Sequence, residues 1–157
     1  MSAHYATIDW ELRDPDFIKG RYSREHTWTF DGGLVVAASP SPSVVPTPWS
    51  NPANVDPEEA FVASVSSCHM LTYLYLAAKA GYLIERYRDA AVGTMTKNER
   101  GVPWVSLITL HPGITYGANK RPDATAEAEL HHHAHEQCFI ANSIKTEVKV
   151  ESPSVPV

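Results

Sequence analysis

The chain has 157 residues, of which 43% are hydrophobic and 20% charged, enough for one domain, residues 1–157, with a sizeable core. Its formal net charge of −5 and its lack of any Lys/Arg-rich block argue against a nucleic-acid-binding surface. No apolar segment opens the chain as a secretory signal would, so we expect a cytoplasmic protein. Two cysteines are too few for a disulfide framework, which leaves packing, catalysis or metal binding as their roles.

The first segments alternate apolar and polar residues, which is the pattern of half-buried strands. This alternation covers residues 6–12 and residues 26–30, and residues 34–38 also look extended. The Asp31-Gly32-Gly33 turn between the last two segments predicts a β-hairpin. A connector with five prolines, residues 39–54, follows, and connectors of this length are often functional.

A long helix is predicted after the connector. Asp56 can cap it, Pro57 suits its first position, Glu59 completes a capping box, and Gly81 is a natural stop. Apolar residues lie on nearly every side, so we expect protein to surround this helix and consider a partner chain plausible. Residues 60–80 are long enough to span a bilayer, but six polar side chains among them favour a helix buried in protein.

The second half of the chain is predicted to contain three strands and one helix. The strands cover residues 89–96, 104–110 and 146–151. Pro122 and Asp123 open the helix, which places Cys138 and Ala141 on one apolar face. The expected order is β-β-β-α-β-β-α-β, and because strands and helices are grouped, the fold class is α+β.

Cys68 lies about three turns into the first predicted helix, and Cys138 lies near the end of the second. A nucleophilic cysteine must be ionised, which requires positive charge nearby or a helix N-terminus. Cys68 is too far along its helix for the helix dipole to help, so activation must come from other segments. On composition alone, packing is the favoured interpretation of this thiol.

Glu58 is the free carboxylate of the helix start, because Glu59 has the capping role. Glu58 and Cys68 are ten residues apart, or about 15 Å along a straight helix, so they cannot touch within one helix. Glu58 could serve Cys68 only across a symmetric dimer. Otherwise it is a solvated carboxylate of the first turn.

A histidine cluster at residues 131–135 raises the alternative of a metal site. His131, His135 and Cys138 recur at i, i+4 and i+7, and with Cys68 they could supply four zinc ligands. Histidines in a polar stripe are more often solvated, so we expect no metal and no cofactor. The sequence also lacks a nucleophile elbow and a glycine-rich phosphate loop.

Two segments resemble the OsmC/Ohr family, the osmotically induced and organic-hydroperoxide-resistance proteins. Residues 56–68, DPEEAFVASVSSC, are similar to the helix-start motif of that family. Residues 134–138, AHEQC, leading into Asn142-Ser143, are similar to the segment that carries its second cysteine. The element order and the cysteine spacing also fit, so the resemblance covers most of the chain.

The resemblance implies an intertwined homodimer with two central helices and active sites at the interface. It implies that Cys68 is the peroxidatic cysteine, Cys138 the resolving cysteine and Glu58 a supporting carboxylate. Well-known members carry an arginine beside the thiolate, in the first hairpin or before the helix. Neither the turn at residues 31–33 nor residues 39–56 contains one. The candidate replacements are Arg21, Arg24, His26 and His69.

The leading hypothesis is therefore a thiol peroxidase. Cys68 would attack a hydroperoxide and become a sulfenic acid, Cys138 would condense with it, and a dithiol reductant would restore both thiols. Apolar surroundings favour a small apolar hydroperoxide, and the aromatic residues expected there are Trp49, Phe61, Tyr73 and Phe139. The alternatives are a non-catalytic OsmC-like dimer that binds an apolar ligand, and a His/Cys zinc protein. No nucleic acid or membrane is expected as a partner.

Overall fold

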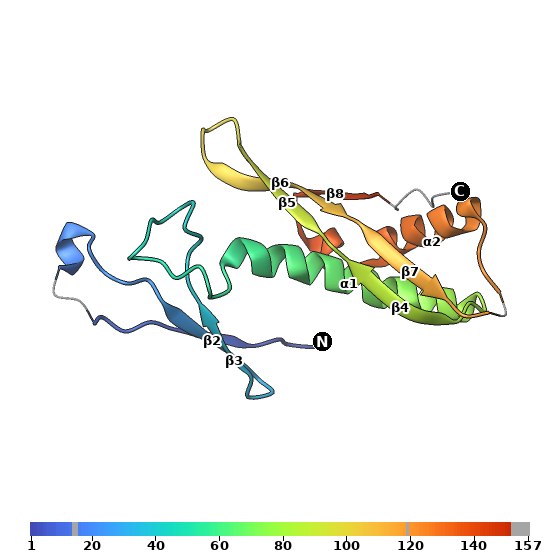
Figure 1. The fold of residues 1–157 in the computed structure, drawn as a ribbon, viewed down its shortest axis with the longest axis horizontal. Coiled ribbons are helices and arrows are strands. Elements are labelled where there is room, and N and C mark those ends of the chain that lie inside the picture. The colour runs from blue at the N-terminus through green and yellow to red at the C-terminus, as the bar shows by residue number, and fades with distance from the viewer. Residues whose placement is uncertain (14–15, 119, 152–157) are drawn as a thin grey trace. The chain divides into compact units, whose positions relative to one another are not determined.

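The computed structural model describes residues 1–13, 16–118 and 120–151 (Figure 1). These residues form two α-helices and eight strands, which confirms the predicted α+β class. They divide into two compact units, Met1–Ala60 and Phe61–Val157, called here the N-terminal and C-terminal units. Each unit is described by itself, and the single domain expected for residues 1–157 stays a prediction.

The N-terminal unit contains a three-stranded antiparallel sheet in the order β1-β2-β3. Its strands are β1 (Ala6–Asp9), β2 (His26–Phe30) and β3 (Val35–Ala38), with a 3-10 turn at Phe17–Lys19. The hairpin predicted over residues 26–38 is confirmed, since His26 lies opposite Ala38. Gly33 closes its turn with a φ of 84°, a left-handed conformation that glycine adopts without strain.

Hydrogen bonds fasten the proline-rich connector to this hairpin. The Ser39 N–H donates to the Val55 carbonyl at 3.0 Å, and the Ser39 hydroxyl accepts from the Asn51 N–H at 2.8 Å. The Glu25 carboxylate accepts from the side-chain amides of Asn51 and Asn54 at 2.9 and 3.2 Å. The connector therefore has a defined path that delivers the chain to the start of the first helix.

Helix α1 (Pro57–Lys79) begins and ends as predicted. The Glu59 N–H donates to the Asp56 carboxylate at 2.7 Å, and the Asp56 N–H donates to the Glu59 carboxylate at 3.2 Å, which is a capping box. At the other end Gly81 has a φ of 81°, and its N–H donates to the Ala78 carbonyl.

The C-terminal unit has four strands between its helices, two more than predicted: the predicted strands at residues 89–96 and 104–110 correspond to β5 (Val92–Lys97) and β6 (Pro103–Leu110), and two others were missed. Strand β4 (Ile84–Asp89) pairs with β7 (Pro112–Tyr116), and β5 pairs with β6. Strand β4 was missed because a register shift between Ile84 and Arg86 interrupts its alternation. Strand β7 was missed because it begins with Pro112 and Gly113, which are poor strand formers. The last strand, β8 (Glu147–Val150), runs parallel to β6.

Helix α2 (Ala124–Gln137) packs against α1 in one of two small cores of this unit. Asp123 caps it as predicted, accepting from the Ala126 N–H at 2.8 Å. Tyr73 and Ala77 of α1 meet Ala134 of α2 in one core. In the other core, Val65 of α1 meets Ile108 and Leu110 of β6.

Helix α1 buries one stripe of its surface within the described residues. That stripe contains Val65, His69, Tyr73 and Ala77. Leu71 and Tyr75 on other sides remain 62% and 63% exposed. By length and composition α1 could also cross a membrane, but a single such helix is weak evidence, since core helices of soluble proteins pass the same test.

Candidate redox site

The two cysteines meet in the C-terminal unit. Both are free thiols, with Cys68 half-buried on α1 and Cys138 only 1% exposed at the end of α2. Cys68 lies close enough to Cys138 to affect the pKa of the Cys138 thiol. The Ile140 N–H lies 3.5 Å from the Cys68 sulfur, and the Ala141 N–H lies 3.4 Å from the Cys138 sulfur. Each sulfur therefore has the other thiol and one backbone donor beside it.

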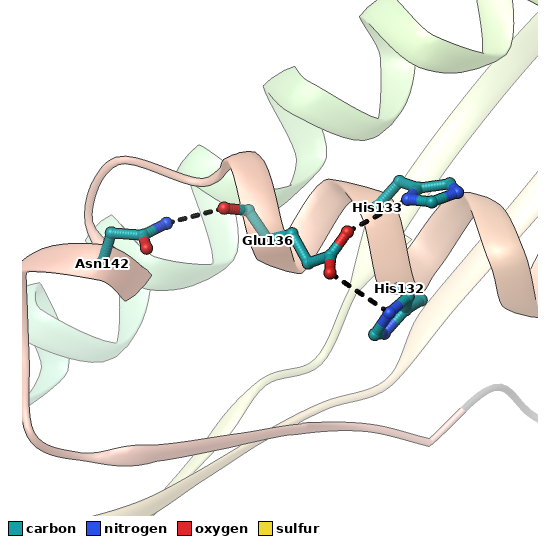
Figure 2. A network of polar contacts seen from close by, with 4 residues as sticks. All are labelled: His132, His133, Glu136 and Asn142. Carbon is teal, nitrogen blue, oxygen red and sulfur yellow. Dashed lines mark hydrogen bonds and ion pairs between the residues drawn. The ribbon is translucent and has the colours of Figure 1, made fainter.

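A turn after α2 holds Cys138 in this place. Helix α2 ends at Gln137, and Cys138 has extended dihedrals, so the prediction that the helix continues to Ala141 is wrong. The Asn142 side chain donates to the Glu136 carbonyl at 2.8 Å (Figure 2). It also donates to the Cys138 carbonyl at 2.9 Å. These bonds satisfy carbonyls that a longer helix would have used, and a short 3-10 segment, Ala141–Ser143, follows.

The two thiols have unequal environments. Burial raises the pKa of the Cys138 thiol to about 11, and the adjacent Cys68 adds to this rise, while the N–H groups of Ala141 and Ile140 oppose it. Cys138 is therefore a protonated, enclosed thiol near neutral pH. Cys68 is the more accessible sulfur of the pair, so an incoming reagent reaches it first.

The chain resembles known proteins along its length. The family model described as OsmC-like protein matches residues 50–152, which include both cysteines. The chain belongs to the OsmC family. An OsmC-like protein of unknown function from Vibrio cholerae is similar over 98% of this chain and 100% of its own, with 50% identity and a TM-score of 0.94. The resemblance recognised in the sequence is therefore confirmed.

More distant OsmC/Ohr structures share the fold. The organic hydroperoxide resistance protein OhrB of Bacillus subtilis is 19% identical over 97% of this chain and 98% of its own, with a TM-score of 0.67. An organic hydroperoxide resistance protein from Legionella pneumophila is 16% identical over 97% and 96%, with a TM-score of 0.68. At these identities the similarity shows the fold alone. No curated protein matches the chain.

The described residues of this OsmC family member do not form the zinc site of histidines and cysteines that the spacing suggested. His131 points to His69 of α1, with 3.1 Å between His131 Nδ1 and His69 Nε2. Among the described residues, no group of three or more His, Cys, Asp or Glu side chains is arranged to hold a metal ion. The alternative of a site built from His131, His135, Cys138 and Cys68 is therefore wrong.

The structure removes one candidate for the cation beside Cys68. His69 is 1% exposed, and burial lowers its pKa to about 4, so this ring is uncharged at neutral pH. His26 is held between two neighbours in the N-terminal unit: it accepts from the Trp28 indole at 2.9 Å and donates to the Arg24 carbonyl at 2.8 Å. Both of its ring nitrogens thus have hydrogen-bond partners within the N-terminal unit.

The remaining predicted residues lie in the N-terminal unit. The Arg24 guanidinium donates to the carbonyls of Tyr22 and Gly20 and lies 4.0 Å from the centroid of the Tyr22 ring. Arg21 forms a backbone bridge with Asp16. Glu58 is half-buried in the first turn of α1. The action of Glu58, Arg21 or Arg24 on Cys68 stays a prediction.

An open, mostly apolar pocket of about 600 Å³ is lined by chain neighbours of the two cysteines, such as Gln137 and Phe139 on either side of Cys138, but by neither cysteine itself. Its lining residues come from α1 and from the turn after α2: Leu71, Thr72, Tyr75, Glu136, Gln137, Phe139 and Asn142. Thr72 donates to the Cys68 carbonyl at 3.0 Å, and the Phe139 ring is 83% exposed. Of the aromatic residues expected near the thiols, Phe139 lines this pocket, whereas Tyr73 and Phe61 pack into the two cores and Trp49 belongs to the N-terminal unit.

Sequence reasoning missed the backbone donors at Ile140 and Ala141. No side-chain pattern marks an N–H group, and the only signal was Asn142 shortly after an apolar helix, a residue type that often ends helices. It also missed the contact between His69 and His131, because these residues lie on different helices.

Proposed function

We propose that this OsmC family chain is a thiol peroxidase that reduces organic hydroperoxides with Cys68 and Cys138. The observation that carries the proposal is the contact between two free thiols of unequal environment, one accessible and one enclosed with a raised pKa. The Bacillus subtilis and Legionella pneumophila proteins named for organic hydroperoxide resistance share this fold. The open, mostly apolar pocket lined by chain neighbours of the two cysteines suits a substrate with an apolar body.

The proposed reaction begins at Cys68. Its thiolate attacks the distal peroxide oxygen, the O–O bond breaks, and the organic part leaves as an alcohol after taking a proton. Cys68 is now a sulfenic acid, and the peroxide has been reduced by two electrons. The Ile140 N–H lies 3.5 Å from the Cys68 sulfur and is a backbone donor directed at the reacting atom.

Cys138 then resolves the sulfenic acid. Its sulfur attacks the Cys68 sulfur, an S–S bond forms, and the sulfenic hydroxyl leaves as water with the Cys138 proton. The raised pKa of Cys138 keeps this thiol protonated until Cys68 is oxidised, which suits a resolving role. A dithiol reductant completes the cycle by thiol–disulfide exchange, becoming a disulfide itself as both cysteines return to thiols.

The proposal includes a homodimer in the cytoplasm. Exposed apolar side chains on α1 support it, because Leu71 and Tyr75 are more than 60% exposed on a helix that is apolar on most sides. A second copy would cover this surface and could bring its Glu58 to the Cys68 of its partner. Glu58 would then hold a neighbouring cationic group in place beside the thiolate.

Stopped-flow reduction of cumene hydroperoxide tests the proposal. Cys68→Ser should abolish turnover, whereas Cys138→Ser should allow one turnover and then let Cys68 proceed to sulfinic acid. Ser67→Ala, at an exposed neighbouring position on the same helix, is the matched control and should keep the full rate. An undiminished rate in Cys68→Ser would end the proposal.

A second candidate is a non-catalytic dimer that binds an apolar ligand, and the 600 Å³ pocket lined by chain neighbours of the two cysteines is the observation that favours it. The pKa of Cys68 distinguishes the two functions. A Cys68 that titrates near the ordinary thiol value of about 8.5 supports binding alone, whereas a clearly lower value supports peroxidase chemistry.

A further inference from the structure

Two buried histidines connect the helices that carry the two thiols. His69 on α1 is 1% exposed, and His131 on α2 is 4% exposed. His69 Nε2 and His131 Nδ1 are 3.1 Å apart, and the ring planes differ by 10°. The Tyr73 ring also packs against His131, with 4.3 Å between ring centroids. The pair thus forms a packed junction between α1 and α2.

This junction is built for uncharged rings. One ring donates its N–H and the other accepts, so each histidine needs only its neutral form. The outer nitrogens, His69 Nδ1 and His131 Nε2, are buried and have no hydrogen-bond partner among the described residues. A proton added to either ring places a positive charge in a buried site whose new N–H has no acceptor. When both rings are protonated, two N–H donors face each other across the contact.

Among the described residues, the charged groups that affect the pKa values of the pair do not offer a free counterion. On β4, the negative charge of Asp89 raises the pKa of His69. The Asp89 carboxylate, however, already accepts hydrogen bonds from the Ser66 hydroxyl and the His111 N–H. On α2, His135 acts in the opposite direction and disfavours charge on His69. Three tyrosines of the packed elements form a further group: Tyr73 on α1 contacts the Tyr87 ring on β4 and hydrogen-bonds with Tyr116 on β7, and Tyr116 donates to Glu127 of α2.

The position of the pair gives it a consequence for the thiols. His69 directly follows Cys68 on α1. His131 helps to hold α2, which ends at Gln137, the residue before Cys138. We propose that the His69–His131 pair is an acid-sensitive latch, whose protonation releases α2 from α1 and separates Cys138 from Cys68. The effect of the latch on peroxide reduction rests on the proposed function, whereas the release of α2 does not.

Hydrogen exchange at different pH values tests the latch in the full-length protein. Burial of the pair lowers the pKa of each histidine to about 4 from an unfolded value near 6.5, so the released state binds more protons between these values. Protection of the α2 amides, corrected for intrinsic exchange, should therefore fall at least tenfold between pH 7 and pH 5, while protection in β6 falls less.

Variants and a direct titration complete the test. Glutamine replaces the hydrogen-bonding capacity of histidine without titrating, so the double variant His69→Gln/His131→Gln should lose the pH dependence of α2 protection. His133→Gln, at an exposed position on the same helix, should keep it. Should the double variant fail to fold, imidazole NMR titration of the wild-type chain decides, and a pKa of 6 or higher for both histidines overturns the latch. Equal loss of protection in α2 and β6 also overturns it.

Disulfide formation separates the latch from the peroxidase proposal. Oxidation by diamide, which needs no peroxide, should give less Cys68–Cys138 disulfide at pH 5 in the wild type than in the double variant. A latch confirmed by hydrogen exchange in a chain that does not react with hydroperoxides would leave the inference standing and refute only the peroxidase.

Discussion

Slow alkylation of Cys138 is the prediction that follows most directly from the geometry of the site. With a pKa of about 11, about 0.1% of Cys138 is thiolate at pH 8, compared with about 24% of a thiol with the ordinary pKa of 8.5. This is a deficit of roughly 200-fold. A more basic thiolate is also a better nucleophile, which raises the rate constant of the thiolate by a factor of about 10 to 20. The net expectation is a reaction at least tenfold slower than that of an exposed thiol.

Residue-specific mass spectrometry after timed iodoacetamide treatment at pH 8 measures this rate. The Cys68→Ser variant is the best sample, because its hydroxyl stays beside the Cys138 sulfur while the competing thiol is gone. Its rate should be at least tenfold below that of the same variant unfolded in urea, and the 1% exposure of Cys138 lowers it further. Equal rates in the folded and unfolded samples, or a pH–rate inflection near 8.5, would refute the reasoning.

Three further variants test the fold and the assembly. Asp56→Ala removes the capping-box acceptor of Glu59 and should lower the free energy of unfolding by about 1 kcal/mol in urea titrations; an unchanged midpoint would argue against the cap. Gly93→Ala would place a Cβ 2.5 Å from Val62 Cγ2 and should cost about 1–3 kcal/mol, whereas Gly32→Ala meets no atom within 4 Å and should cost far less. Leu71→Asp should convert the proposed dimer to monomers in sedimentation velocity experiments, and a wild-type chain that is already monomeric would contradict the dimer.

Local signals predicted those parts of the fold whose cause is local. The start of α1 followed from Asp56-Pro57-Glu58-Glu59, because a capping box needs only four consecutive residues. The end of α2 was predicted too late in the sequence, because Cys138 and Ala141 continue the apolar periodicity of the helix. The helix ends where the Asn142 side-chain amide donates to the last carbonyls of α2 and of the residue after it. A hydrophobic period contains no information on such a side-chain contact.

Contacts between segments far apart in the sequence could not be predicted from the spacing of residues within one helix. The stripe of His131, His135 and Cys138 on one predicted helix face suggested shared metal ligands, but the partner of His131 comes from α1. The meeting of Cys68 and Cys138 was predicted only through the resemblance to the OsmC/Ohr family, since nothing in either helix pattern refers to the other. The even spread of apolar residues around α1 predicts a helix covered on most sides, whereas the described residues bury one stripe of it, so its cover by a partner chain stays a prediction.

The central claim is that Cys68 and Cys138 form one redox pair, and a peptide map after peroxide treatment tests it most directly. Reduced protein mixed with one equivalent of cumene hydroperoxide should become lighter by about 2 Da, and the peptides containing Cys68 and Cys138 should be joined by a disulfide. Sulfinic or sulfonic acid on Cys68 with Cys138 still free, or no change in mass, would contradict the account.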